Sequence, residues 1–156
     1  MKKIILLICL FLLGCASNLS TTRISNTPID PSDKTLVLLN SSIWDIDIKT
    51  NFVKAGFNIK SMPSVFEATQ KVNDTTTVRY NKAEARYGIM QHPGKVVDWC
   101  LYNKNIKFGD YALEVVDLNT NETILVVSQG GWTGDCFPST GNLFEDLSLA
   151  LRQNWK

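Results

Sequence analysis

The sequence predicts a two-layer α/β domain, in which helices pack on a small mixed sheet, and three features indicate this fold class. Residues 35–39 form a short apolar run typical of a buried strand. Two strand-like runs, 111–118 and 123–128, flank a polar turn and predict a late β-hairpin. The last fifteen residues repeat apolar side chains at steps of three and four, which predicts an amphipathic C-terminal helix.

The first predicted unit is a strand, a helix and a second strand. The segment 43–55 fits helical spacing, although its residues 44, 46 and 48 also alternate as in a strand. Its length favours the helix, as does Gly56, which suits the left-handed position that follows a helix. Alternation over 57–62 predicts the next strand and completes a β-α-β unit.

The middle of the chain gives weaker patterns. They predict a helix at 63–72, a polar loop at 73–77, a loop or helical turn at 78–86, and strands at 85–91 and 96–101. The two strands are expected to join across a turn at His92-Pro93-Gly94, because this composition is typical of turns.

The final helix carries the clearest pattern. Its apolar face comprises Leu143, Phe144, Leu147, Ala150, Leu151 and Trp155. Ser139 or Thr140 is the expected cap, with Asn142 as the nearest competitor.

Composition indicates an ordinary globular protein. The 156 residues are 44% hydrophobic and 20% charged, which excludes collagen-like, low-complexity and wholly disordered classes. The formal net charge is +1. Nucleic-acid binding is therefore not expected as the main function, because the phosphate backbone requires a basic face.

The N-terminus has the pattern of an export signal. Lys2 and Lys3 precede an unbroken apolar run over 4–13, which is too short for a membrane span but typical of a signal peptide. The following Leu12-Leu13-Gly14-Cys15 resembles the lipobox of bacterial lipoprotein precursors. The resemblance implies a signal peptide at 1–14 and palmitate and other acyl chains on Cys15. Ala16, where an Asp would imply retention in the inner membrane, implies an outer-membrane anchor with the domain in the periplasm.

Residues 15–34 are predicted to be the lipidated cysteine and a flexible tether. They are rich in Ser, Thr, Asn, Asp and Pro, with too few apolar side chains to offset the entropy of ordering them. Residues 35–156 are then a single globular domain. Loss of Lys2 and Lys3 changes the net charge to −1, so the lipid alone must hold the protein at the membrane.

The order of elements over 35–156 carries a second resemblance. It is similar to the small α/β domain of penicillin-binding-protein activator lipoproteins, curli-secretion lipoproteins and the amino-terminal part of the Tol-system propeller protein. This resemblance implies a protein-binding scaffold, and it implies no catalytic residues.

Cys100 and Cys136 are the two cysteines left after Cys9 is removed and Cys15 is lipidated. In an oxidising periplasm two thiols most simply form a disulfide. A buried reduced pair and a redox couple are the alternatives, although redox pairs are usually spaced Cys-x-x-Cys.

The segment 128–141 is the most distinctive part of the chain. It contains four glycines, Trp132 and Phe137 beside Cys136. One interpretation is that the segment displays both rings to a partner, with Gly130 and Gly131 shaping the loop. The other is that both rings pack on the core and the glycines only permit the turn.

Few other residues suggest chemistry. His92 is expected to be an exposed turn residue, and Asp45, Asp47, Asp98, Asp110 and Asp117 to be caps or solvated side chains. No nucleophile elbow, phosphate-binding loop or zinc-binding helix motif occurs in the sequence. No cofactor or metal is therefore expected.

We therefore expect an outer-membrane-anchored periplasmic lipoprotein that is not an enzyme. Its expected role is to bind another envelope protein or the cell wall, as an accessory to assembly or regulation. Two alternatives remain: a hydrolase of envelope material with a carboxylate-based site, and a carrier of a small ligand or lipid.

Overall fold

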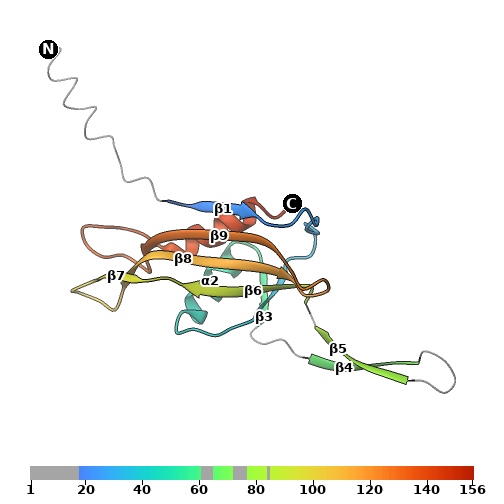
Figure 1. Ribbon diagram of the computed structural model, residues 1–156. Helices are drawn as coiled ribbons and strands as arrows, with labels where there is room; N and C mark the ends of the chain where they lie inside the picture. Colours follow the sequence, from blue (N-terminus) through green and yellow to red (C-terminus); the bar gives the residue numbers. More distant parts are fainter. Residues whose placement is uncertain (1–17, 61–64, 72–76, 84) are drawn as a thin grey trace, which may run out of the picture.

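A computed structural model describes residues 18–60, 65–71, 77–83 and 85–156 of the chain. The main sheet has seven strands, in the order β1-β9-β8-β6-β2-β3, with β7 also paired to β8 (Figure 1). The strands are β1 (Ser20–Arg23), β2 (Thr35–Leu38), β3 (Asn58–Lys60), β6 (Tyr87–Pro93), β7 (Val96–Trp99), β8 (Ile106–Asp117) and β9 (Glu122–Trp132). The predicted signal peptide and Cys15 lie outside the described residues.

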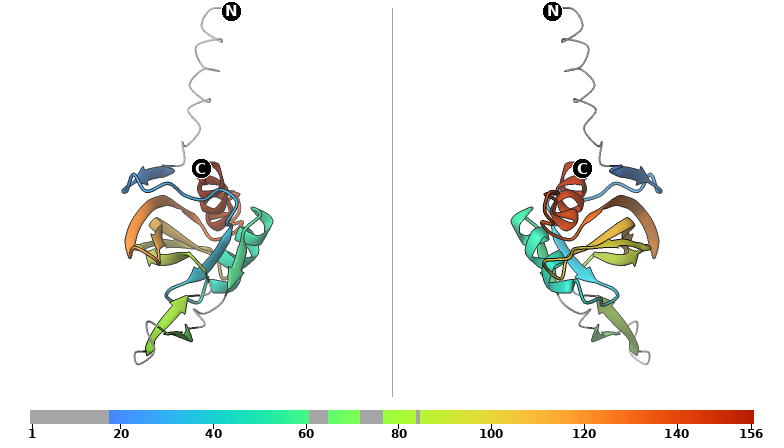
Figure 2. Two further views of the ribbon diagram at one scale, coloured as in Figure 1. Left: turned by 90° about the vertical axis from the view of Figure 1, so that its right-hand side faces the viewer. Right: turned by 90° about the vertical axis from the view of Figure 1, so that its left-hand side faces the viewer.

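Two helices, α2 (Asp45–Lys54) and α3 (Leu143–Gln153), cover one face of this sheet (Figure 2). The fold is therefore α/β, as predicted, with a mixed sheet, a late hairpin of β8 and β9, and a C-terminal helix. Neither helix in the described ranges has the length and hydropathy of a membrane span.

The predicted β-α-β unit is confirmed. β2 runs parallel to both β3 and β6, so the chain must cross over between β2 and β3, and α2 makes that crossover. Ile48 and Phe52 of α2 are completely buried, whereas Ile46 is exposed, which is the helical rather than the strand pattern. Gly56 follows the helix with a φ of 90°, as a left-handed residue after a helix should.

An aromatic cluster closes the core beneath α3. The ring of Trp155 meets those of Phe57 and Tyr87 edge to face, with centroids 5.2 and 5.0 Å apart. The helix is capped by Asn142, whose side chain accepts a hydrogen bond from the backbone N–H of Glu145. The N-cap is therefore Asn142, and the expectation of Ser139 or Thr140 as the cap is wrong.

The tether prediction is wrong from Ser20 onward. β1 pairs antiparallel with β9, and backbone hydrogen bonds to an open sheet edge need no apolar side chains, so composition does not reveal such a strand. Ile29 is buried in the core. The Trp155 indole donates a hydrogen bond to the carbonyl oxygen of Asp33 at 3.0 Å. The folded domain therefore begins at Ser20 and not at residue 35.

The helix predicted at 63–72 is also wrong. Residues 65–71 and 77–83 form an antiparallel pair, β4 (Val65–Lys71) and β5 (Thr77–Ala83), in a sheet of their own. The predicted loop at 73–77 lies mostly outside the described residues. Three of the residues at 65–71 are β-branched or aromatic and favour a strand. However, no local pattern in the sequence indicates that this segment pairs with the polar strand at 77–83.

His92-Pro93-Gly94 is not a turn between paired strands. β6 and β7 do not pair with each other; both pair with β8, one after the other. Backbone hydrogen bonds from Gly94 to Asp110 and from Gly109 to Lys95 carry the pairing across the junction. The chain reverses instead at 100–105, between β7 and β8.

Candidate functional site

Two loops project from one end of the main sheet and are joined by a disulfide bond. Loop 100–105 connects β7 to β8, and loop 133–141 connects β9 to α3 (Figure 1). Cys100 and Cys136 are bonded, with Cα atoms 5.6 Å apart, which confirms the predicted disulfide. Closing a loop of this length stabilises a fold by about 3–4 kcal/mol in the chain-entropy model.

Hydrogen bonds brace the same two loops. The side-chain amides of Asn103 and Asn105 both donate to the carbonyl oxygen of Asp135 at 2.8 Å. Within the second loop, the backbone of Cys136 exchanges hydrogen bonds with that of Ser139. The disulfide therefore belongs to a network that holds both loops in one conformation.

Gly130 and Gly131 differ in whether their surroundings leave room for a side chain. A Cβ on Gly130 would lie 2.3 Å from the carbonyl oxygen of Gly109, so only glycine allows β8 and β9 to approach here. A Cβ on Gly131 would lie 3.7 Å from Leu143 Cδ1, which is an ordinary contact. Neither glycine has a positive φ. Gly130 is thus required by the sheet, whereas Gly131 leaves space beside α3.

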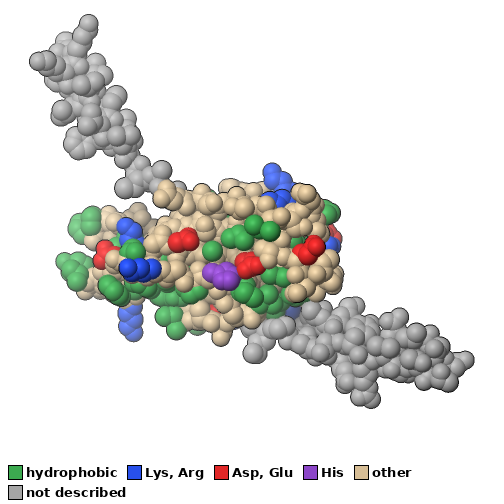
Figure 3. Space-filling model, in the orientation of Figure 1, with side chains coloured by type: hydrophobic (Ala, Val, Ile, Leu, Met, Phe, Trp, Pro, Cys, Tyr) green, Lys and Arg blue, Asp and Glu red, His purple; other side chains and the backbone are tan. Residues whose placement is uncertain are grey.

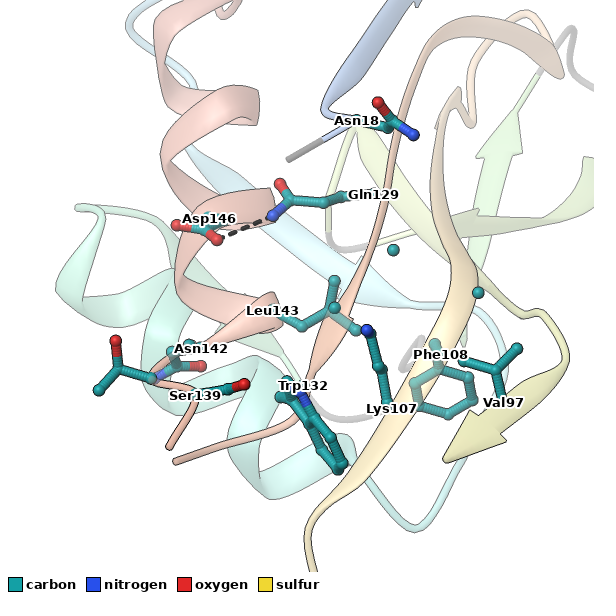
Figure 4. Close-up of a pocket in the computed structure, with 15 residues that line it drawn as sticks. Asn18, Val97, Lys107, Phe108, Gln129, Trp132, Ser139, Asn142, Leu143 and Asp146 are labelled. Atoms are coloured by element: carbon teal, nitrogen blue, oxygen red, sulfur yellow. Dashed lines mark hydrogen bonds between the residues drawn. The ribbon is translucent and has the colours of Figure 1, made fainter. Parts of the chain in front are cut away.

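That space is part of a cleft of about 440 Å³ between the start of β8, the end of β9 and the start of α3 (Figure 4). The Trp132 indole forms one wall, and the Lys107 ammonium lies 6.0 Å from its ring centre. Deeper in, the Gln129 side chain donates to Asp146 at 2.9 Å. Asn18, which precedes β1, also lines the cleft.

The cleft is mixed in polarity and balanced in charge. Its described lining contains one ammonium, of Lys107, and one carboxylate, of Asp146, together with apolar side chains, side-chain amides, hydroxyls and the indole. The Gln129 Oε1 atom is buried without a hydrogen-bond partner in the described part of the chain. An aromatic wall with amides beside it suits a neutral polar segment such as a peptide.

A second feature lies beyond this cleft, and we call it the aromatic tip. It consists of Trp99 at the end of β7, Leu101 and Tyr102 in loop 100–105, and Phe137 in loop 133–141. Their exposed fractions are 65%, 92%, 83% and 85%. Hydrophobic side chains gather at this end of the molecule in Figure 3. Exposed apolar side chains concentrated in one place indicate an interaction surface.

The structure places the two rings of segment 128–141 differently, and neither belongs to the buried core. Trp132 is half-buried as a wall of the cleft, together with Gly130 and Gly131. Phe137 points into solvent on the aromatic tip. The sequence predictions did not single out Asn18, Lys107 or Asp146, which come from three separate segments, or Gln129, which lies within segment 128–141 itself.

The other candidate residues have structural roles. His92 lies on β6 with its ring 2.7 Å from the Glu114 carboxylate, rather than in a turn. Asp117 is completely buried and paired with the Arg86 guanidinium at 2.9 Å, so it is not a solvated side chain. No group of three or more His, Cys, Asp or Glu side chains in the described ranges could hold a metal ion.

Asp45 belongs to a polar network beneath the sheet. The Asp45 carboxylate accepts two hydrogen bonds, from the Gln91 side-chain amide at 2.8 Å and from the Ser42 backbone N–H at 2.9 Å. Burial raises the pKa of Asp45, but these hydrogen bonds outweigh burial and the net pKa is lowered. Tyr111 donates to Gln91 at 2.8 Å, and burial raises the pKa of this tyrosine to about 12. The network satisfies buried polar groups and lies outside the cleft.

Neither a protein-family model nor a curated protein sequence matches the chain. Solved structures to which the chain is distantly similar include the PelC dodecamer from Paraburkholderia phytofirmans, at 11% identity and a TM-score of 0.45, covering 90% of this chain and 94% of that chain. A substituted variant of the same dodecamer has 10% identity and a TM-score of 0.47, with coverages of 87% and 94%. A likeness this distant carries no inference about function.

Proposed function

We propose that the chain is an outer-membrane-anchored periplasmic lipoprotein whose domain binds another envelope protein without catalysing a reaction. The anchor is argued from the sequence Leu12-Leu13-Gly14-Cys15 and the apolar run before it. The binding role is argued from the cleft beside Trp132, and this cleft is the observation that carries the proposal.

Three properties of the cleft support protein binding. Its walls are fixed, because the Cys100–Cys136 disulfide holds one side and the first turn of α3 forms another. A preorganised surface loses little conformational entropy when a partner binds. The Trp132 ring supplies the type of aromatic contact that dominates protein interfaces. The Asp146 carboxylate is the only one in the described lining, so the cleft does not present the carboxylate pair that a glycoside hydrolase uses.

Photo-crosslinking in the native envelope tests this proposal. A photoreactive residue in place of Thr140, which lines the cleft, is expected to give one discrete protein adduct. The same residue in place of Val53, exposed on α2, is the control and is expected to give none. Equal adduct patterns from the two positions would contradict the proposal.

A substitution that fills the cleft provides the second arm. Gly131→Gln is expected to abolish the Thr140 adduct, because the space around Gly131 accepts a side chain without a backbone clash. Ile46→Gln, at an exposed position on α2, is the matched control and is expected to leave the adduct intact. An adduct that survives Gly131→Gln would place the contact outside the cleft.

A further inference from the structure

The aromatic tip and the start of the folded chain lie at the same end of the sheet. β1 is antiparallel to β9, and Ser20 is paired with Ser128, so β1 begins near the end of β9 that leads into loop 133–141. Asn18 lines the cleft together with Val97 and Trp132. Figure 1 shows β1 starting on the side from which both loops project.

The length of the chain limits the distance between Asn18 and Cys15. Only residues 16 and 17 lie between Cys15 and Asn18, and the three residue steps span at most about 11 Å even when the chain is fully extended. Leu101 and Tyr102 lie four and five positions beyond Val97, which lines the same cleft as Asn18. The tip and Cys15 can therefore reach the same plane, and the domain cannot move far from a lipid on Cys15.

We propose that the aromatic tip rests in the surface of the membrane that carries the lipid anchor, with Trp99, Leu101, Tyr102 and Phe137 at the level of the headgroups. This inference depends on the proposed lipid modification of Cys15. Trp and Tyr are favoured at this level because their rings have an apolar body and a polar end. Leu101 and Phe137 supply apolar area that otherwise stays in water.

The charge of the tip indicates how it binds. The two loops and the end of β7 carry Lys104 against Asp98 and Asp135, so they do not form a basic patch. Attraction to anionic headgroups is therefore not the cause of binding, which depends on insertion of apolar side chains. The cleft, directly beside the tip, then opens close to the membrane surface and receives its partner there.

Fluorescence quenching by brominated lipid tests the position of the tip. The mature protein carrying its lipid is reconstituted in phosphatidylcholine vesicles whose acyl chains are brominated near the headgroup. Emission from Trp99 is expected to be lost, and Trp99→Phe is expected to remove the quenchable component. Anionic lipid and added salt are expected to leave the quenching unchanged.

Two double variants separate insertion from simple proximity. Leu101→Asp with Phe137→Asp is expected to restore Trp99 emission, whereas Ile46→Asp with Val53→Asp, at exposed positions on α2, is expected to leave it quenched. Both variants should still float with the vesicles, because the lipid on Cys15 holds them. Normal folding is checked by the circular dichroism spectrum.

The outcomes are distinguishable. Protein that floats with the vesicles but shows unquenched Trp99 would overturn the membrane contact while leaving the anchor intact. Trp99 that is protected from aqueous iodide yet unquenched by brominated lipid would mean that a protein, such as a second copy of this chain, covers the tip, and this too would overturn the inference. Failure to float at all would overturn the lipid anchor itself.

Discussion

Ser20 lies opposite Ser128 in antiparallel register, and this pairing sets the position at which the chain enters the sheet. Only residues 16–19 separate Cys15 from β1. With the proposed lipid on Cys15, a connection this short would restrict the position of the domain as well as attach it, because the five residue steps from Cys15 to Ser20 span at most about 18 Å. The two loops therefore lie at the end of the sheet at which β1 begins.

Ile29 tests whether the segment after β1 belongs to the folded domain. Its side chain is 3% exposed and lies in the core. Ile29→Ala is expected to lower the free energy of unfolding by about 2–4 kcal/mol, through lost burial and the cavity that remains. Ile24→Ala, at an exposed position, is expected to cost under about 0.5 kcal/mol. Urea denaturation measures both, and equal effects would mean that residue 29 does not pack in the core.

Removal of the disulfide is expected to destabilise the domain. Replacing both Cys100 and Cys136 by Ala should lower the free energy of unfolding by about 3–4 kcal/mol, because the bond constrains the unfolded chain. Amide hydrogen exchange in loops 100–105 and 133–141 should increase as well. A variant with wild-type stability and wild-type exchange in these loops would contradict this account.

The cap of α3 offers a comparison among three neighbouring residues. Asn142→Ala is expected to cost about 1 kcal/mol, because its side chain accepts from the Glu145 N–H at the helix start. Ser139→Ala and Thr140→Ala are expected to be nearly neutral, since neither side chain caps the helix. Thermal denaturation of the three variants ranks them, and a larger loss at 139 or 140 would show that the cap is misassigned.

Glu114 makes stability depend on pH in acid. A hydrogen bond from Thr123 lowers its pKa; burial opposes this effect, and His92 adds to it, so the net pKa lies below its ordinary 4.5. A group with a depressed folded pKa stabilises the native state above its unfolded pKa, and this stabilisation is lost as pH falls through the folded value. Glu114→Gln is therefore expected to flatten the decline of stability below pH 4.5. An unchanged slope in urea titrations would contradict the assignment.

Elements with a regular pattern of buried apolar side chains were predictable from the sequence. α3 and the hairpin of β8 and β9 have periodic apolar side chains, because one face of each is buried against the other. The disulfide was predicted from the two cysteines outside the N-terminal segment, on the expectation of an oxidising compartment. In these cases the pattern of residue types in the sequence matches the environment of those residues in the folded protein.

Elements formed through the backbone alone were not predictable. β1 is exposed along its whole length and is held by β9, which is about a hundred residues away in the sequence. The same holds for the junction of β6 and β7, where Pro93 and Gly94 suggest a turn but the pairing with β8 continues. Local composition cannot report a partner that is remote in the chain.

The candidate site was predictable only in part. Trp132 and Phe137 were predicted as candidate binding residues because they lie in a glycine-rich segment beside Cys136. The tip residues of loop 100–105 were not predicted, because 96–101 was predicted as a strand. In the structure β7 ends at Trp99, and Leu101 and Tyr102 enter a loop in solvent.

The central claim is that the domain is held at a membrane through Cys15, with only a short connection to β1. Mass spectrometry of the N-terminal peptide from the mature protein tests it most directly. The account predicts a peptide that begins at Cys15 and carries the mass of acyl chains on the thiol and the amino group. A peptide that begins elsewhere, or an unmodified Cys15, would contradict it.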